Sequence, residues 1–79
     1  MKVRLIDKNY VETGKTEVIV EITVIIKRWL WTATKLYRKV HGEYFEYKNN
    51  EYTLLKGEEK DRVASWFKLP TEDSVFIKS

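Results

Sequence analysis

Two tryptophans and five cations lie together in the stretch IIKRWLWTATKLYRKV, residues 25–40, which contains no acid. Lysine and arginine attract phosphate and carboxylate groups, and an exposed indole can stack on a base or fill a pocket. The stretch therefore predicts a binding surface, and a solvated face with a covered Trp31 is the alternative. The candidate residues are Lys27, Arg28, Trp31, Lys35, Arg38 and Lys39.

A second candidate surface lies in EYFEYKNNEYT, residues 43–53, and its candidates are Tyr44, Glu46, Tyr47 and Tyr52. Neighbouring side chains of a strand point to opposite faces, so one face of this segment packs on the core and the other still carries aromatic rings. The rings would suit base stacking, but the surrounding glutamates repel phosphate. Cross-strand aromatic pairing explains them better, and an acidic, tyrosine-rich surface also suits a basic protein partner.

Side chains for catalysis and metal binding are scarce. His41 is the single histidine, and there is no cysteine to serve as a nucleophile, a zinc ligand or half of a disulfide. The three glycines are far apart, so no phosphate-binding glycine-rich loop is expected. The acids of EEKD, residues 58–61, match the positive end of a helix dipole. We therefore expect a protein that is not an enzyme and that uses no metal or cofactor.

Length and composition predict one domain across residues 1–79, with 43% hydrophobic residues to build a core. The charged N-terminus MKVRLIDKNY does not resemble a signal peptide, and apolar runs such as VII are far too short to span a membrane. The absence of cysteine fits a reducing compartment. We expect a cytoplasmic protein without a membrane partner.

The charge is unevenly distributed. Residues 1–40 hold nine Lys/Arg and four Asp/Glu, whereas residues 41–79 hold six and eight. No acid occurs between Glu21 and Glu43. Such asymmetry bears on partners rather than on the fold.

Two strands are predicted at the N-terminal end, Lys2–Ile6 and Thr16–Val24, with a glycine-containing turn between them. In the second strand, β-branched residues alternate with polar ones, which predicts one buried face. These two segments form a predicted hairpin.

A helix is predicted from about Ile25 to His41, because residues 16–41 contain no Gly, Pro, Asn or Asp. At 100° per residue, the apolar residues fall within an arc of about 140°. They are Ile22, Ile25, Ile26, Trp29, Leu30, Ala33, Leu36, Tyr37 and Val40. The alternative is that His41–Gly42 forms a two-residue hairpin turn and that TATKLYRKV is a strand, which would make the protein mostly β.

The C-terminal half predicts strands Tyr44–Lys48 and Glu51–Leu55 around an Asn49–Asn50 turn. A shorter helix follows in Gly57–Pro70, with Val63, Trp66 and Phe67 as its apolar stripe. Asp73–Lys78 is the last predicted strand.

The predicted fold is α+β in the order β-β-α-β-β-α-β, and the alternative is a mostly antiparallel β fold with one C-terminal helix. This order resembles the ubiquitin-like β-grasp family, and the TGKT turn (Thr13–Thr16) and the closing TEDSVFIK (Thr71–Lys78) match its layout. The chain lacks the family's di-glycine tail, so the resemblance does not imply conjugation to other proteins.

These features predict a small binding protein that docks onto another protein. Its basic surface and its acidic hairpin are separate, unlike the continuous basic footprint of a DNA-binding protein. Nucleic-acid binding through residues 27–39 is one alternative, and self-assembly, for example as a homodimer, is another. Size alone suggests a phage or mobile-element accessory protein that inhibits a host machine.

Overall fold

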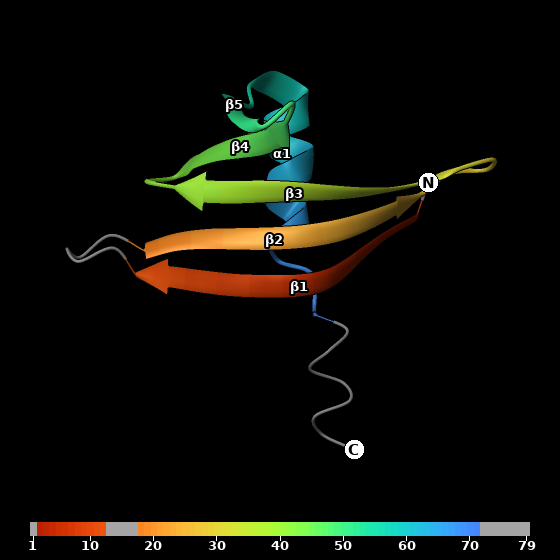
Figure 1. Ribbon diagram of the computed structural model, residues 1–79, viewed down its shortest axis with the longest axis horizontal. Coiled ribbons are helices and arrows are strands. Elements are labelled where there is room, and N and C mark those ends of the chain that lie inside the picture. The colour runs from red at the N-terminus through yellow and green to blue at the C-terminus, as the bar shows by residue number, and fades with distance from the viewer. Residues whose placement is uncertain (1, 13–17, 72–79) are drawn as a thin grey trace, which may run out of the picture.

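The computed structural model describes residues 2–12 and 18–71, which form one antiparallel sheet and one helix (Figure 1). The sheet contains β1 (Lys2–Glu12), β2 (Val18–Lys27), β3 (Thr32–Val40), β4 (Glu43–Lys48) and β5 (Glu51–Leu54). The helix α1 (Gly57–Trp66) follows β5 directly. The predicted turn at 13–16 and the predicted strand at 73–78 lie outside the described residues.

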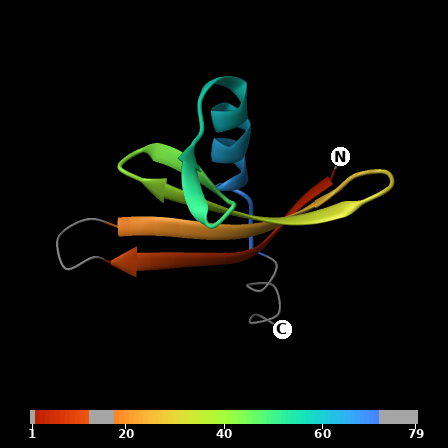
Figure 2. The same ribbon diagram turned by 45° about the horizontal axis from the view of Figure 1, so that its top comes forward.

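The strands follow one another in the sheet in the order β1-β2-β3-β4-β5, and each pair is antiparallel. The helix lies across one face of this meander, as Figures 1 and 2 show from two directions. We call the opposite side of the sheet the open face, because no other element of the described chain lies on it.

The predicted helix at residues 25–41 is wrong. Residues up to Lys27 continue β2, and the chain reverses over Arg28–Trp31 and returns as β3. The β-branched residues of this region, which include Ile25, Ile26, Thr32 and Thr34, pack better on a pleated sheet than in a helix. The order β-β-α-β-β-α-β and the β-grasp layout are wrong for the same reason. The mostly β alternative with one C-terminal helix is the observed architecture.

Two turns contain the residues that tight hairpins require. His41 and Gly42 have φ angles of 52° and 76°, and Asn49 and Asn50 have 54° and 65°. Two successive positive φ angles match the right-handed twist of the flanking strands. The alternative His41–Gly42 turn and the predicted Asn49–Asn50 turn are both confirmed.

A bulge at Ile6 interrupts the pairing of β1 with β2, because Leu5 lies opposite Val24 while Asp7 lies opposite Thr23. Because of the extra residue, odd-numbered positions of β1 point toward α1 before the bulge, and even-numbered positions do so after it. Leu5 therefore points into the core, and so does Lys8, whose Nζ donates a hydrogen bond to the carbonyl of Phe67 at 2.8 Å.

The core lies between the sheet and α1. Its buried residues include Leu5, Ile22, Val24, Ile26 and Tyr37 from the sheet and Leu55, Val63, Trp66 and Phe67 from the C-terminal part. Edge-to-face contacts of Tyr37 with Trp66 and of Tyr44 with Phe67 join the two layers, with ring centroids 5.7 and 5.2 Å apart. The predicted apolar stripe of the C-terminal helix is therefore confirmed.

Candidate functional site

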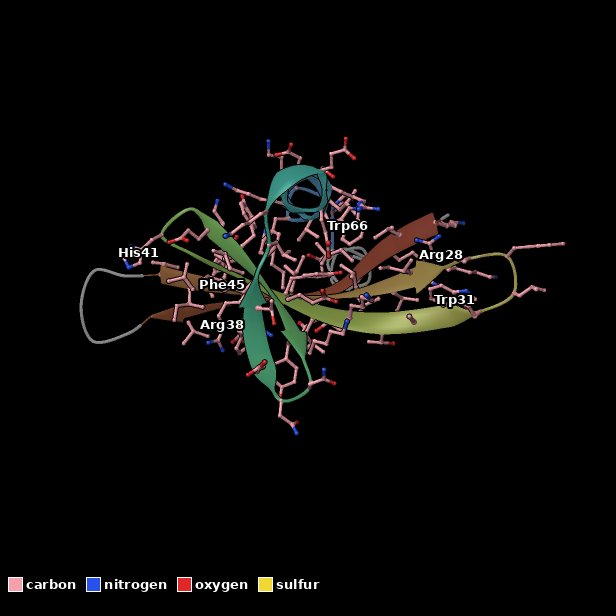
Figure 3. The ribbon with its side chains drawn as sticks, turned by 90° about the horizontal axis from the view of Figure 1, so that it is seen from above. Arg28, Trp31, Arg38, His41, Phe45 and Trp66 are labelled. Carbon is pink, nitrogen blue, oxygen red and sulfur yellow. The ribbon has the colours of Figure 1, made fainter. Side chains whose placement is uncertain are left out.

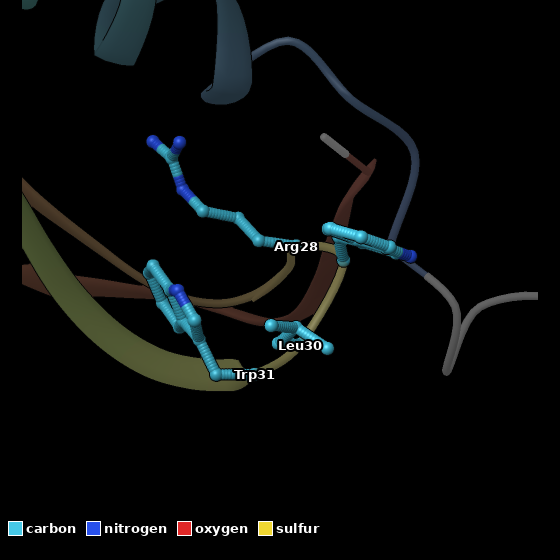
Figure 4. A pocket seen from close by; sticks show the side chains of 4 residues that line it. Arg28, Leu30 and Trp31 are labelled. Atoms are coloured by element: carbon cyan, nitrogen blue, oxygen red, sulfur yellow. The ribbon is translucent and has the colours of Figure 1, made fainter.

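The turn between β2 and β3 exposes its largest side chains. We call residues Arg28–Trp31 the tip. Trp29 is 93% exposed, Leu30 81% and Trp31 52%. Figure 4 shows Arg28, Leu30 and Trp31 around the open hollow that the four tip residues line. Three adjacent apolar side chains at the end of a hairpin make a compact surface that the core does not use.

The tip lacks the residues that make tight turns stable. Gly, Asn, Asp and Pro are preferred in turns, but this one has Trp29 and Leu30 at its centre. Neither residue has a positive φ, unlike the central residues of the β3–β4 and β4–β5 turns. Among the hairpin turns within residues 18–71, two therefore have suitable turn chemistry, and the β2–β3 turn departs from it. Such a departure from local consistency is expected at functional sites.

Contacts within the tip hold its shape. The Arg28 amide donates a hydrogen bond to the Trp31 carbonyl at 2.8 Å. The loop of the hairpin therefore consists of two residues, Trp29 and Leu30. The Arg28 guanidinium lies 5.4 Å from the ring centroid of Trp31, a cation–π distance. Trp31 is thus partly covered by its neighbour, while Trp29 and Leu30 point into solvent.

Cations flank the tip. Lys27 ends β2 and lies directly opposite Lys2 of β1. Like charges at opposite positions of an antiparallel pair repel each other and destabilise the pair. The stretch of chain from Ile22 to Gly42 contains no acid to offset them. An acidic group on a partner would relieve this repulsion.

The six residues of the first predicted surface do not share one face. Side chains alternate along β3, so Lys35 and Lys39 lie on the α1 side and Arg38 lies on the open face. In Figure 3, Arg28 and Trp31 lie toward one end of the β2–β3 hairpin, whereas Arg38 lies toward the other end, with His41 and Phe45. Only Lys27, Arg28 and Trp31 are gathered at or beside the tip.

The cations of β3 are engaged within the protein. Lys35 forms an ion pair with Glu46 at 3.1 Å, and the Lys39 ammonium lies 5.5 Å from the Tyr44 ring centroid. Arg38 forms an ion pair with Glu21 at 2.9 Å. These contacts lower the charge that the three side chains present to a partner.

The second predicted surface is also divided. Tyr44 and Glu46 lie on the α1 side, and Tyr47 and Tyr52 lie on the open face with ring centroids 5.0 Å apart. This cross-strand pair is the arrangement that the sequence favoured over base stacking. The Arg38 guanidinium lies 4.1 Å from the Tyr52 ring centroid.

The hydroxyl of Tyr52 donates a hydrogen bond to Glu21 at 3.3 Å. Burial raises the pKa of this phenol, and Glu21 raises it further, while Arg38 opposes the shift. Tyr52, Glu21 and Arg38 therefore form one connected polar group near the middle of the open face.

Sequence reasoning missed Trp29 and Leu30, the most exposed members of the tip. Both were assigned to the apolar side of the predicted helix and so to the core. The usable signal was that β-branched residues occur on both sides of a pair, Trp29 and Leu30, that is not favoured in turns.

Neither a metal site nor a membrane-crossing helix is found in the described part of the chain. Residues 2–12 and 18–71 contain no group of three or more potential His, Cys, Asp or Glu ligands. Within the same ranges, no helix has the length and apolar character needed to cross a membrane. Comparisons with protein-family models, with curated proteins and with solved structures return no match for this chain.

Proposed function

We propose that this protein is a non-catalytic binding domain that docks onto another protein by inserting its tip into an apolar pocket. The observation that carries the proposal is the exposure of Trp29 and Leu30 at the end of a hairpin whose turn they do not favour. Trp31 and Arg28 would contact the rim of the pocket, and Lys27 would face acidic groups beside it.

The energetics support this role. Moving one exposed leucine-sized side chain from water into an apolar pocket contributes about 1.5–3 kcal/mol. Trp29 and Leu30 together therefore supply enough free energy to anchor a complex, and tryptophan is enriched among residues that dominate binding energy. The tip is already held by its internal hydrogen bond, which limits the entropy lost on docking.

A protein partner fits better than a nucleic acid. Binding to phosphate requires several unpaired cations along one track. Lys35 and Arg38 are paired with glutamates on opposite faces of the sheet, so the basic track predicted for residues 27–39 is interrupted. A domain of this kind acts by occupying a surface of its partner, which is also how a small inhibitor of a larger machine would work.

The proposal is tested by photo-crosslinking in cells of the source organism. A photoreactive phenylalanine analogue replaces Trp29 in one variant and Asn50, in the exposed β4–β5 turn, in a control variant. We expect a discrete protein adduct from position 29 and none from position 50. An excess of the wild-type protein should compete for the adduct, because it occupies the same pocket.

A second competitor separates the tip from the rest of the surface. The double variant Trp29→Asn, Leu30→Gly keeps the hairpin but removes the apolar anchor, so it should not compete. Equal competition by this variant, or equal adducts from both positions, would exclude the tip as the docking site. Adducts with nucleic acid instead of protein would favour the alternative partner.

A further inference from the structure

A second hollow lies between the β2–β3 hairpin and α1, on the side of the sheet that α1 covers. We call it the side cleft, and it has a volume of about 220 Å³. Side chains between Ile26 and Tyr37 of the hairpin form one wall, and side chains between Glu59 and Trp66 of α1 form the other. Pockets for drug-sized ligands have volumes of about 300–1,000 Å³. The side cleft is smaller, and its volume suits a single side chain of a partner.

The side cleft begins at the tip, because Arg28 lines both hollows. Ile26 points into the core, and side chains two residues apart on a strand lie on the same face, so Arg28 is also on the α1 side. In Figure 4 the Arg28 side chain extends from the turn toward α1. A partner that receives the tip would therefore also meet the mouth of the side cleft.

The floor of the side cleft is apolar. Ile26, Val63 and Trp66 line it and belong to the buried core. Apolar surroundings lower the local dielectric constant, and charge interactions are stronger there than in bulk water. An ion pair formed over this floor is therefore stronger than one formed on an open surface.

The walls of the side cleft carry more positive than negative charge. Arg28, Lys35, Arg62 and Glu59 line it, and Lys35 is already paired with Glu46. Neither arginine forms an ion pair with an acid within the described part of the chain, although Glu59 precedes Arg62 by only three residues on α1. When Glu46 is counted with its partner, three cations face two acids, which leaves one positive charge in excess.

These charges act on the same place, the phenol of Tyr37, which also lines the side cleft. Burial raises the pKa of this phenol, the charges of Glu46 and Glu59 raise it further, and Arg62 opposes them. Charged groups from the sheet and from α1 therefore lie close enough to interact with one bound group.

A single carboxylate matches this site. It carries one negative charge, and arginine can bind it through two parallel hydrogen bonds. A phosphate monoester carries a charge of about −1.5 to −2 at pH 7, so Glu46 and Glu59 would repel it more strongly.

We infer that the side cleft binds the carboxylate of an aspartate or glutamate side chain on the protein onto which the tip docks. Arg28 and Arg62 donate hydrogen bonds to the carboxylate from the two walls, and Glu59 weakens its binding. The partner thus has an acidic residue beside its apolar pocket, on the side that faces α1. The assignment of the carboxylate to this partner rests on the proposed function, whereas the binding of a carboxylate does not.

An NMR titration tests the site without the partner. The probe is glutamate blocked at its α-amino and α-carboxyl groups, which has one free carboxylate, and blocked glutamine is the neutral control. We expect the glutamate probe to shift the Nε–H signals of Arg28 and Arg62 in a saturable way. Equal shifts from both probes, or shifts at Lys2 and Lys27 instead, would overturn the inference. Tighter binding of inorganic phosphate than of blocked glutamate would overturn the assignment to a carboxylate.

Charge variants provide matched comparisons. Arg62→Glu should weaken binding of blocked glutamate at least about tenfold, because it places a like charge against the probe. Lys68→Glu makes the same change at an exposed position just beyond α1 and outside the side cleft, so binding should be nearly unchanged. Glu59→Gln should strengthen binding, because it removes an opposing charge. Unchanged binding in both Arg62→Glu and Glu59→Gln would overturn the inference, and circular dichroism melting checks the fold of each variant.

The crosslinking assay then tests whether the carboxylate belongs to the partner. As a competitor for the adduct from position 29, Arg62→Glu should be needed at a higher concentration than Lys68→Glu. Equal competition would overturn the inference and leave docking by the tip intact. If blocked glutamate binds but position 29 gives no adduct, the docking role fails instead, and the side cleft would then be assigned to a free carboxylate ligand.

Discussion

Arg38 illustrates how the local surroundings decide what a charged residue can do. Its guanidinium contacts Glu21 and the ring of Tyr52, and its side chain is 30% exposed. The Nε atom is buried and lacks a hydrogen-bond partner within the described part of the chain. Burying a donor without a partner costs free energy, so the ion pair and the stacked ring must offset that cost. Arg38 is therefore a structural residue of the open face rather than a free cation of a basic surface.

Tyr37 leads to a prediction, also at the scale of a single residue, about how the stability of the protein depends on pH. The residue is buried against Trp66, and burial, followed by the charges of Glu46 and Glu59, raises the pKa of its phenol above the ordinary value of about 10. Because the folded-state pKa is higher, the stability that Tyr37 contributes is fully present below about pH 10. It is lost as the pH rises through the folded-state pKa.

Urea unfolding between about pH 9 and 11 measures this effect, with Tyr37→Phe as the comparison. The wild-type free energy of unfolding should fall more steeply with pH than that of the variant, which cannot ionise at this position. Parallel curves would show that the phenol of Tyr37 is not responsible for the alkaline loss of stability.

At the scale of elements, the β2–β3 and β4–β5 turns predict different responses to substitution. The double variant Trp29→Asn, Leu30→Gly gives the β2–β3 turn the residues that two-residue hairpins prefer. We expect it to raise the free energy of unfolding by about 0.5–2 kcal/mol, the usual range for improved local chemistry. Thermal or urea unfolding of monomeric protein at low concentration measures the change.

The opposite result is equally informative. If the double variant unfolds more easily than the wild type, then Trp29 and Leu30 stabilise the hairpin itself, and their exposure is not evidence of docking. A matched substitution of Asn49 and Asn50 by Trp and Leu should destabilise the β4–β5 turn, because both positions have positive φ angles.

The elements at the two ends of the described chain were predictable, and the middle was not. The Asn49–Asn50 pair predicted the β4–β5 hairpin by its turn preference alone, and the acids and apolar stripe of α1 predicted a helix. Between Ile22 and Tyr37 the signal was ambiguous, because a spacing of four residues is two pleats of a strand and about one turn of a helix. Ile22 and Ile26, and likewise Ala33 and Tyr37, are inward-facing in either structure.

The candidate site was only partly predictable for the same reason. Lys27, Arg28 and Trp31 were identified by residue type, since cations and tryptophans are candidate binding residues in any fold. Trp29 and Leu30 were not identified, because their exposure depends on a turn that contains no Gly, Asn, Asp or Pro to indicate it in the sequence. The grouping of Lys35, Arg38 and Lys39 on one surface depended on the helix and failed with it.

At the scale of the whole molecule, the topology predicts rapid folding. Every strand pairs with its neighbour along the chain, and α1 packs back onto the sheet that immediately precedes it. The short sequence separations between paired strands lower the loop-closure entropy that must be lost before the transition state, although the contacts of α1 and Phe67 with β1 close a longer loop. We expect refolding to be complete within milliseconds to tens of milliseconds, faster than in all-β sandwiches of similar size.

Stopped-flow refolding from urea, monitored by circular dichroism at low protein concentration, measures this rate. A single exponential phase is expected for the monomer. A rate that depends on protein concentration would show that association contributes to the rate-limiting step, and refolding over seconds would contradict the argument from topology.

The distribution of the tryptophans gives the protein an intrinsic optical reporter. Trp29 and Trp31 lie at the tip, while Trp66 is buried beside Tyr37. Indole fluorescence shifts to shorter wavelength when water around the ring is replaced by apolar groups, so the emission of the free protein contains a red component from the tip and a blue one from the core. Contact at the tip would change the first component and leave the second as an internal reference, without any attached dye.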